Sequence, residues 1–188
     1  MAHRPQRADA RRNREKVVAA AAAAFAESGL EAQVEDIARR AGVGVGTVYR
    51  HFPTKEALVE ALAVEHFEAL ASIAEAALEE DGAPWDVFAA AIWRSASAAA
   101  ANIAWCEIIG GHPTAAQAAS PGQLRLAAAV TALIGRAQAA GVMRKDATVE
   151  DVRTIMCGFG HVAAARSAGA AMDWERYLEI ALDGLRAR

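Results

Sequence analysis

The side chains best suited to chemistry lie in a short stretch near residue 50. Thr47, Arg50 and His51 carry hydrogen-bonding groups, and their i, i+3, i+4 spacing puts them on one face of a helix. A hydroxyl, a guanidinium and an imidazole on such a face can read base edges in the major groove of DNA. Tyr49 and Lys55 flank this face, where their polar ends can meet phosphates. The stretch therefore predicts DNA recognition rather than catalysis.

Two short helices are expected to hold this face in place. Apolar residues spaced i, i+3, i+4, i+7 predict a helix over residues 34–41, and Gly42 is suited to end it. A second helix is predicted over residues 45–52, with Val48 and Phe52 one turn apart on its buried side. Two short helices that meet at a glycine turn form a helix-turn-helix, in which the second helix enters the major groove.

The rest of the chain is also expected to be helical. Hydrophobic residues make up 54% of the sequence but aromatic residues only 6%, because alanine is abundant, and alanine has the highest helix propensity. The predicted fold is all-α, with about nine helices. A three-helix DNA-binding domain over residues 1–55 is expected to be joined by a long helix to a helical domain over residues 56–188. The helices outside the helix-turn-helix are predicted to start near residues 9, 54, 84, 121, 148 and 173.

Charge is distributed unevenly along the sequence. The chain has a formal net charge of −3, but residues 1–16 carry six basic and two acidic side chains. This segment therefore sums to +4 and leaves −7 for the remainder. A basic segment on an acidic body favours a polyanionic partner at that end only. Taken alone, the segment is equally consistent with a solvated terminal tail.

Several short motifs surround the predicted reading face. They are Ile37-Ala38, Ala41-Gly42-Val43, Gly46-Thr47-Val48-Tyr49, His51-Phe52 and Lys55-Glu56-Ala57-Leu58. With these motifs, the sequence over about residues 10–62 resembles the DNA-binding domain of the TetR family of transcriptional regulators. The resemblance implies that double-stranded DNA is the partner. It also implies that basic residues near the N-terminus contact the DNA backbone or minor groove, a role that falls here to Arg11, Arg12 and Arg14.

Two positions depart from the family pattern. Gln33 stands where the family usually has Thr or Ser, and Gly44 stands where it often has Ser. Both are helix N-cap positions, so the weak cap at Gln33 costs its helix on the order of 1 kcal/mol and the glycine about a few tenths. Both changes also remove hydroxyls that could touch phosphate. Val45 offers an apolar contact, for example to a thymine methyl, and Gly46 completes the predicted DNA-binding set.

The resemblance implies two roles for the second half of the chain, a small-molecule pocket and a dimer interface. Each candidate for the pocket is more often a plain core residue, so a cavity bounded by the mid-chain helices is the deciding observation. The candidates are bulky groups mixed with a few polar ones: His66, Phe67, Leu70, Phe88, Ile92, Trp93, Trp105, Met156, Phe159 and His161.

A dimer also has a physical basis. A short recognition helix makes few base contacts, so two half-sites about 34–36 Å apart multiply the affinity. The last predicted helix has a wide apolar face, part of which is expected to lack a partner within the chain. The predicted interface consists of Val152, Ile155, Trp174, Tyr177, Leu178, Leu182 and Leu185. The alternative is that this whole face packs internally.

These expectations combine into one functional prediction. The protein is expected to be a repressor that binds a palindromic operator as a homodimer and is released by a small hydrophobic or amphipathic ligand. A constitutive or architectural DNA-binding protein without ligand control is the first alternative. A more remote one is a metal or redox sensor, because Cys157 and His161 are spaced i, i+4 and Cys106 lies near His112. Activation rather than repression also stays open.

Other classes are excluded by what the sequence lacks. We find no nucleophile elbow, phosphate-binding loop or pair of catalytic carboxylates, so no enzymatic activity and no cofactor is predicted. Two cysteines do not make a disulfide framework, which fits a reduced cytoplasmic setting. No stretch is long and apolar enough to predict a membrane partner.

Overall fold

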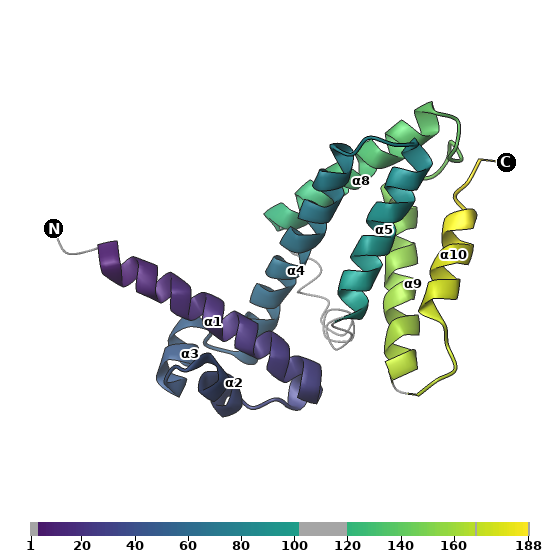
Figure 1. The fold of residues 1–188 in the computed structure, drawn as a ribbon. Coiled ribbons are helices and arrows are strands. Elements are labelled where there is room, and N and C mark those ends of the chain that lie inside the picture. The colour runs from purple at the N-terminus through teal and green to yellow at the C-terminus, as the bar shows by residue number, and fades with distance from the viewer. Residues whose placement is uncertain (1–3, 102–119, 168, 188) are drawn as a thin grey trace. The chain divides into compact units, whose positions relative to one another are not determined.

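Figure 1 shows the fold of the protein as a computed structural model, which describes residues 4–101, 120–167 and 169–187. Across these ranges the chain forms eight α-helices, one 3-10 turn and no β-strand, so the predicted all-α fold is confirmed. No helix within the same ranges is long and apolar enough to cross a membrane. The helices are α1 (Arg4–Ser28), α2 (Val34–Ala41), α3 (Val45–His51), α4 (Lys55–Leu78), α5 (Pro84–Ala100), α8 (Pro121–Ala139), α9 (Val149–Ser167) and α10 (Trp174–Asp183).

The chain divides into two compact units, residues 1–63 and residues 64–188. Helix α4 begins in the first unit and continues without a break into the second. The predicted boundary between a DNA-binding domain and a regulatory domain, after residue 55, lies at the start of this helix. That the DNA-binding role ends at residue 55 and the regulatory role begins after it stays a prediction.

In the first unit, α1 packs against both α2 and α3. The buried side chains include Val18 and Phe25 of α1, Ile37 of α2 and Val48 of α3. Gly42 follows α2 with a φ of 67°, and its N–H bonds to carbonyl groups of the last turn. This left-handed C-cap suits glycine because a side chain would strain it. The predicted turn between the two short helices is therefore confirmed.

Helix α1 begins at Arg4, earlier than the predicted start at Asp9. Pro5 lies in the first turn, where its missing N–H leaves no helical hydrogen bond unmade. Asp9 thus lies inside the helix, and its carboxylate accepts a 2.7 Å hydrogen bond from Arg12 one turn later. The predicted basic arm is an extension of α1 in this structure rather than a separate segment before it.

The helix starts of the second unit follow the predicted caps. Ser120 and Gln123 form a reciprocal capping box at α8, in which the Gln123 N–H donates to Ser120 Oγ at 3.2 Å and the Ser120 N–H donates to Gln123 Oε1 at 2.8 Å. Thr148 and Asp151 pair in the same way at the start of α9. Asp173 caps α10 by accepting a backbone hydrogen bond at 3.1 Å. These predicted starts are confirmed.

The second unit is built around one apolar core to which α4, α5, α8, α9 and α10 contribute. Phe88, Phe159 and Leu178 are among its most deeply buried side chains. The C-terminal segment covers one edge of it, because the Arg186 guanidinium lies 4.3 Å from the centre of the Trp85 ring. Phe88 and Phe159, which the sequence predicted as ligand contacts, therefore lie in this core.

Candidate nucleic-acid interface

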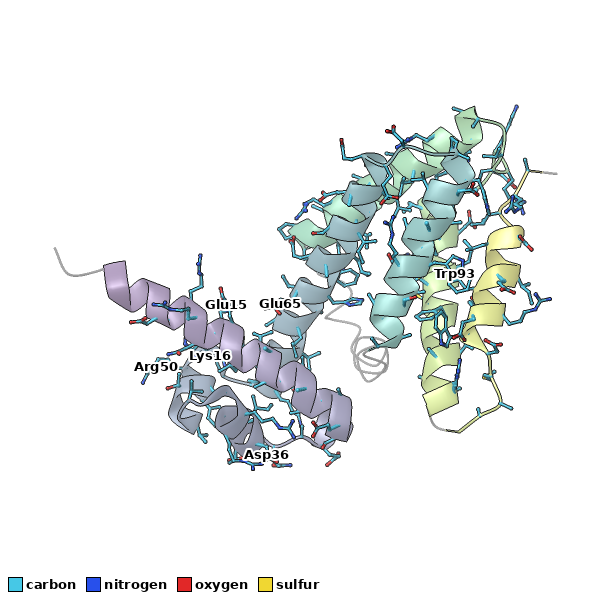
Figure 2. The ribbon with its side chains drawn as sticks, viewed as in Figure 1. Glu15, Lys16, Asp36, Arg50, Glu65 and Trp93 are labelled. Carbon is cyan, nitrogen blue, oxygen red and sulfur yellow. The ribbon has the colours of Figure 1, made fainter. Side chains whose placement is uncertain are left out.

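Helix α3 separates a buried face from an accessible polar face. Val48 is 0% exposed, and Phe52 at the C-cap is 3% exposed. In contrast, Tyr49 is 48% exposed, Arg50 is exposed and Thr47 is half-buried. Figure 2 shows Arg50 on the outer side of α3. The face that the sequence predicted to read DNA is thus one that the first unit leaves accessible.

Two glycines, Gly44 and Gly46, lie at the N-terminal end of α3, and the fold requires glycine at neither position. A Cβ added at Gly44 or Gly46 would meet no atom within 4 Å. Glycine inside a helix costs about 0.5–1 kcal/mol relative to alanine, and Gly46 is exposed. The space beside it is open to a bound partner. Val45 and His51 are half-buried on the same helix.

Helices α2 and α3 begin without side-chain caps, as predicted. The Gln33 amide donates a 2.9 Å hydrogen bond to the Glu31 carbonyl instead of capping α2. At α3, the Gly44 carbonyl accepts the Thr47 N–H at 2.8 Å, but no side chain caps the helix. The start of α3 is therefore held by its backbone and by the burial of Val48.

The arginines of the two short helices differ in their partners. Arg40 donates to both carboxylate oxygens of Glu27 on α1, one of them at 2.8 Å. This pair joins α2 to α1, and it lowers the pKa of Glu27 and raises the pKa of Arg40. Arg39 donates to Asp36 within its own helix. Within the described residues no carboxylate pairs with Arg50, so its guanidinium is available to a ligand.

The other predicted DNA-binding cations lie on α1 and at the start of α4. The Arg14 guanidinium lies 5.3 Å from the centre of the Phe52 ring, next to the end of α3. The Lys55 ammonium lies 5.8 Å from the centre of the Phe25 ring. The Arg14 cation thus lies over a ring at the end of α3, and the Lys55 cation lies over a ring of α1. The remaining two pair with acidic residues one turn away, Arg11 with Glu15 and Arg12 with Asp9.

Except for the exposed His161, the predicted ligand residues of α5 and α9 belong to the core or pack on it. Phe88, Ile92 and Phe159 are buried there. Trp93 and Met156 are half-buried and pack against the same core. Trp93, which is labelled in Figure 2, is therefore a boundary residue rather than a fully buried one.

The other predicted ligand residues have different surroundings. His66 and Phe67 are half-buried on α4, as is Leu70, and the His66 and Phe67 rings are 5.7 Å apart. Burial lowers the pKa of His66, which favours a neutral imidazole at neutral pH. His161 is exposed, and Trp105 lies outside the described residues.

A surface hollow of about 450 Å³ lies where α9 connects to α10. It is lined by Arg166, Ala170, Ala171, Met172, Asp173 and Glu175. None of the predicted ligand residues lines it. The interior pocket of the sequence analysis therefore stays a prediction.

The residues of the predicted metal or redox site are only partly described. The Cys157 thiol is exposed, and Nδ1 of His161 lies 2.9 Å from the backbone oxygen of Cys157. Cys106 and His112 lie outside the described residues. Among the side chains that the structure describes, no group of three or more histidine, cysteine, aspartate or glutamate residues could hold a metal ion.

Most of the apolar face of the last helix, part of which the sequence predicted to lack a partner within the chain, is buried in the single chain. Leu178, Leu182 and Leu185 are at most 6% exposed in the single chain, and Val152 of α9 is 6% exposed. The apolar stripe formed by Leu178, Leu182 and Leu185 is buried because α10 packs along α9 and joins the core of the second unit. The other predicted interface residues, Ile155, Trp174 and Tyr177, are half-buried and pack against the same core.

Two exposed apolar side chains near the end of the chain were missed by sequence reasoning. Ile180 on α10 is 58% exposed, and Met172 just before α10 is 48% exposed. Neither belongs to the apolar stripe. In the sequence, only the positions of these two residues outside the stripe could have indicated that their side chains face the solvent.

Known proteins resemble this chain in both units. Residues 17–62 match the family described as "Bacterial regulatory proteins, tetR family", and residues 95–187 match "Transcriptional regulator SbtR-like, C-terminal domain". A solved TetR transcriptional regulator from Streptomyces coelicolor is 34% identical, covering 93% of this chain and 98% of its own, with a TM-score of 0.64. The chain belongs to the TetR family of transcriptional regulators.

Other TetR-family structures are also similar. A TetR transcription regulatory protein from Mycobacterium vanbaalenii is 33% identical, covering 97% of this chain and 100% of its own, with a TM-score of 0.66. RolR, solved in complex with resorcinol, shares the fold at 19% identity, covering 96% of this chain and 90% of its own, with a TM-score of 0.66. No curated protein matches the sequence. TetR-family proteins are non-enzymatic regulators with a DNA-binding helix-turn-helix, so this chain is a transcriptional regulator and not an enzyme.

Proposed function

We propose that this TetR-family regulator acts in the cytoplasm as a repressor. It binds a palindromic operator as a homodimer and is released by a small hydrophobic or amphipathic ligand. The observation that carries the DNA-binding part is the division of α3 into a face buried through Val48 and a face that exposes Arg50. A short helix with one anchored face and one polar face is what major-groove reading requires.

Different residues serve different parts of the proposed contact. Thr47, Arg50 and His51 read base edges, because all three can hydrogen-bond to them. Val45 and Gly46 allow close approach at the front of the helix. The residues proposed to contact phosphates, and so to position the protein without reading sequence, are Tyr49, Lys55, Arg11, Arg12 and Arg14.

This division of roles predicts different losses for two alanine variants. Arg50→Ala is expected to lose about 1–3 kcal/mol of discrimination at one base-pair position, because it removes a base contact. Lys55→Ala is expected to weaken binding to all sequences and to reduce the salt slope by about 1, because it removes a phosphate contact. Both are measured by fluorescence anisotropy on a duplex recovered from random DNA and on its single-base variants, at several salt concentrations.

The matched control is Arg153→Ala on α9, whose side chain is exposed and pairs only with Glu150 one turn away among the described residues. This variant is expected to change neither the discrimination between bases nor the salt slope. A changed base preference in Lys55→Ala, with an unchanged preference in Arg50→Ala, would contradict the assignment.

The proposed dimer uses the last two helices, with the outward side of α10 at its centre. Leu178, Leu182 and Leu185 are buried in the core of the second unit and so hold α10 in place within its own chain. Ile180 offers the most exposed apolar side chain of α10. The half-buried residues Ile155, Trp174 and Tyr177 are proposed to contribute at its edge.

A pair of aspartate variants tests this surface. Ile180→Asp is expected to raise the dimer dissociation constant at least about tenfold, because each copy would bury an unpaired charge. Leu124→Asp is the matched control, since Leu124 is 62% exposed on α8, outside the proposed surface. Sedimentation equilibrium gives both constants. A dimer that is split by Leu124→Asp and unaffected by Ile180→Asp would place the interface elsewhere.

The proposal that a ligand releases the protein from DNA rests on the TetR family and on the half-buried polar, aromatic and apolar side chains of the second unit. RolR shows that this fold can hold a small aromatic molecule, resorcinol. Around the predicted pocket, half-buried His66 and Phe67 provide a neutral imidazole and an aromatic ring on α4. Leu70, Trp93 and Met156 add half-buried apolar groups, and Trp105 and His161 complete the proposed set. These chemistries suit an uncharged amphipathic ligand.

Gating is tested with compounds that demonstrably bind. Small aromatic and amphipathic compounds that raise the melting temperature are titrated into the operator complex. At least a tenfold loss of operator affinity is expected, and a 100-fold difference in ligand affinity between the two states corresponds to about 2.7 kcal/mol of coupling. An operator affinity unaffected by every stabilising compound would favour a constitutive regulator.

A further inference from the structure

Two metal-ligating side chains lie together on the outward surface of α9. Cys157 and His161 are four residues apart, so they occupy one face of the helix, and both are exposed. Neither belongs to the core of the second unit. A cysteine thiolate and a histidine nitrogen are common ligands of Zn²⁺, and two ligands four residues apart on a helix can hold one ion from the same side.

The ring of His161 is held in the form that a metal ion requires. Its Nδ1 lies 2.9 Å from the backbone oxygen of Cys157. A carbonyl oxygen only accepts hydrogen bonds, so Nδ1 carries the proton, and Nε2 of the neutral ring presents a lone pair. Metal-binding histidines are commonly oriented in this way, by donating the other ring N–H to a carbonyl group. His161 is also in the proposed ligand set, but its exposed ring favours a role at the surface of the second unit.

One chain offers too few ligands for a closed zinc site. Structural zinc sites have four ligands, and the described part of the chain nowhere brings three histidine, cysteine or acidic side chains together around one point. Arg153, one turn before Cys157, pairs with Glu150, so its positive charge is offset there. Two further ligands therefore have to come from another molecule, and a second copy of this chain carries an identical pair.

A second copy can approach this surface closely. The side chains beside the pair on the outward face of α9 are small, namely Thr154, Gly158, Ala164 and Ala165. Helices in close contact have axes about 8–10 Å apart, so side chains from both can reach one ion between them. The surface also adjoins the proposed dimer face, because Gly158 lies against Tyr177 of α10, one turn before Ile180. In a two-fold dimer, residues near the axis meet their own copies.

We propose that Cys157 and His161 from two copies of this chain form a zinc site of two thiolates and two imidazoles across the dimer. The inference rests on the proposed function, because the site is incomplete without the homodimer. Binding converts the two thiols to thiolates and releases two protons, so Zn²⁺ and its ligands are uncharged together. An uncharged site can be buried between two helices without the penalty of an isolated charge.

The test uses the full-length, tag-free protein, which is freed of metal by dialysis against a chelator and titrated with zinc chloride. One zinc ion per two chains is expected to bind. Sedimentation equilibrium is expected to show a dimer dissociation constant at least tenfold lower with zinc than without it. Cobalt chloride is expected to give the visible absorption of a tetrahedral thiolate site, which a merely structural role of Cys157 would not produce.

Three variants assign the ligands. Cys157→Ser and His161→Ala are each expected to lower the zinc affinity at least tenfold and to abolish the effect of zinc on the dimer, because each removes two of the four ligands. Both side chains are exposed, so the metal-free variants are expected to melt within about 2 °C of wild type. Cys106→Ser removes the other cysteine of the sequence and is the matched control, with zinc binding expected to be as in wild type.

The possible failures are distinct. Zinc binding that survives Cys157→Ser, or that occurs at one ion per chain without strengthening the dimer, would overturn the inference. A dimer that forms equally well with and without zinc and binds none would also overturn it, while leaving the proposed homodimer intact. A protein that stays monomeric under both conditions would contradict the homodimer itself, which is a different result.

Discussion

Replacing Phe159 with alanine is expected to lower the free energy of unfolding by about 3–5 kcal/mol. The side chain is 1% exposed, and its ring meets that of Trp174 edge to face, with 5.3 Å between the centroids. Removing the ring deletes buried apolar surface and leaves a cavity that the close-packed core cannot refill. Urea unfolding followed by circular dichroism measures the loss. Leu124→Ala is the surface control, since Leu124 is 62% exposed on α8, and it is expected to stay within about 0.5 kcal/mol of wild type.

The size of this loss distinguishes two roles for Phe159. A core residue gives the large value. A residue that lines an unfilled ligand pocket already lacks part of its packing, so its truncation would cost less than about 2 kcal/mol. A small loss in Phe159→Ala would therefore restore Phe159 as a candidate ligand contact and contradict its assignment to the core.

Gly158→Ala is expected to cost about 2–4 kcal/mol of unfolding free energy. A Cβ at this position would lie 2.1 Å from the Tyr177 hydroxyl, which donates a 3.1 Å hydrogen bond to the Ile155 carbonyl. The methyl group therefore has to displace the hydroxyl, so the variant combines overpacking with a lost hydrogen bond. The same urea measurement reports the change.

Two further variants make this prediction specific. Gly158→Ala/Tyr177→Phe is expected to recover part of the loss, because the atom at 2.1 Å is removed and the ring carbon at 2.9 Å remains. Gly135→Ala on α8 is the matched control, since a Cβ there would meet nothing within 4 Å. It is expected to stabilise the protein by about 0.5–1 kcal/mol. A Gly158→Ala protein as stable as wild type would show that the α9–α10 contact is looser than described.

The local elements could be predicted because their signals are local. Gly42, Ser120 and Thr148 act through neighbouring backbone groups, so their effects can be read from a few adjacent residues. The start of α1 was missed because Asp9 is also a good N-cap type. In the structure it serves instead as an ion-pair partner one turn from Arg12.

The partners of each helix face could not be predicted in the same way. The spacing of Leu178, Leu182 and Leu185 indicates a buried face but does not say whether the chain or a second copy buries it. The structure assigns it to the chain's own core. The contacts of Gly122 and Arg125 with α4 join residues about fifty positions apart in sequence. No periodicity indicates such a contact, since only the tertiary fold brings the two helices together.

Selection of bound duplexes from a random DNA pool tests whether α3 reads a palindrome through Thr47, Arg50 and His51. The wild-type protein is expected to recover a two-fold symmetric site whose half-site centres are about 34–36 Å apart, or a multiple of one helical turn. The same selection with Arg50→Ala is expected to recover a site that has lost its preference at the same position in each half. Recovery of DNA with no sequence preference, or of an identical site by both proteins, would contradict the account.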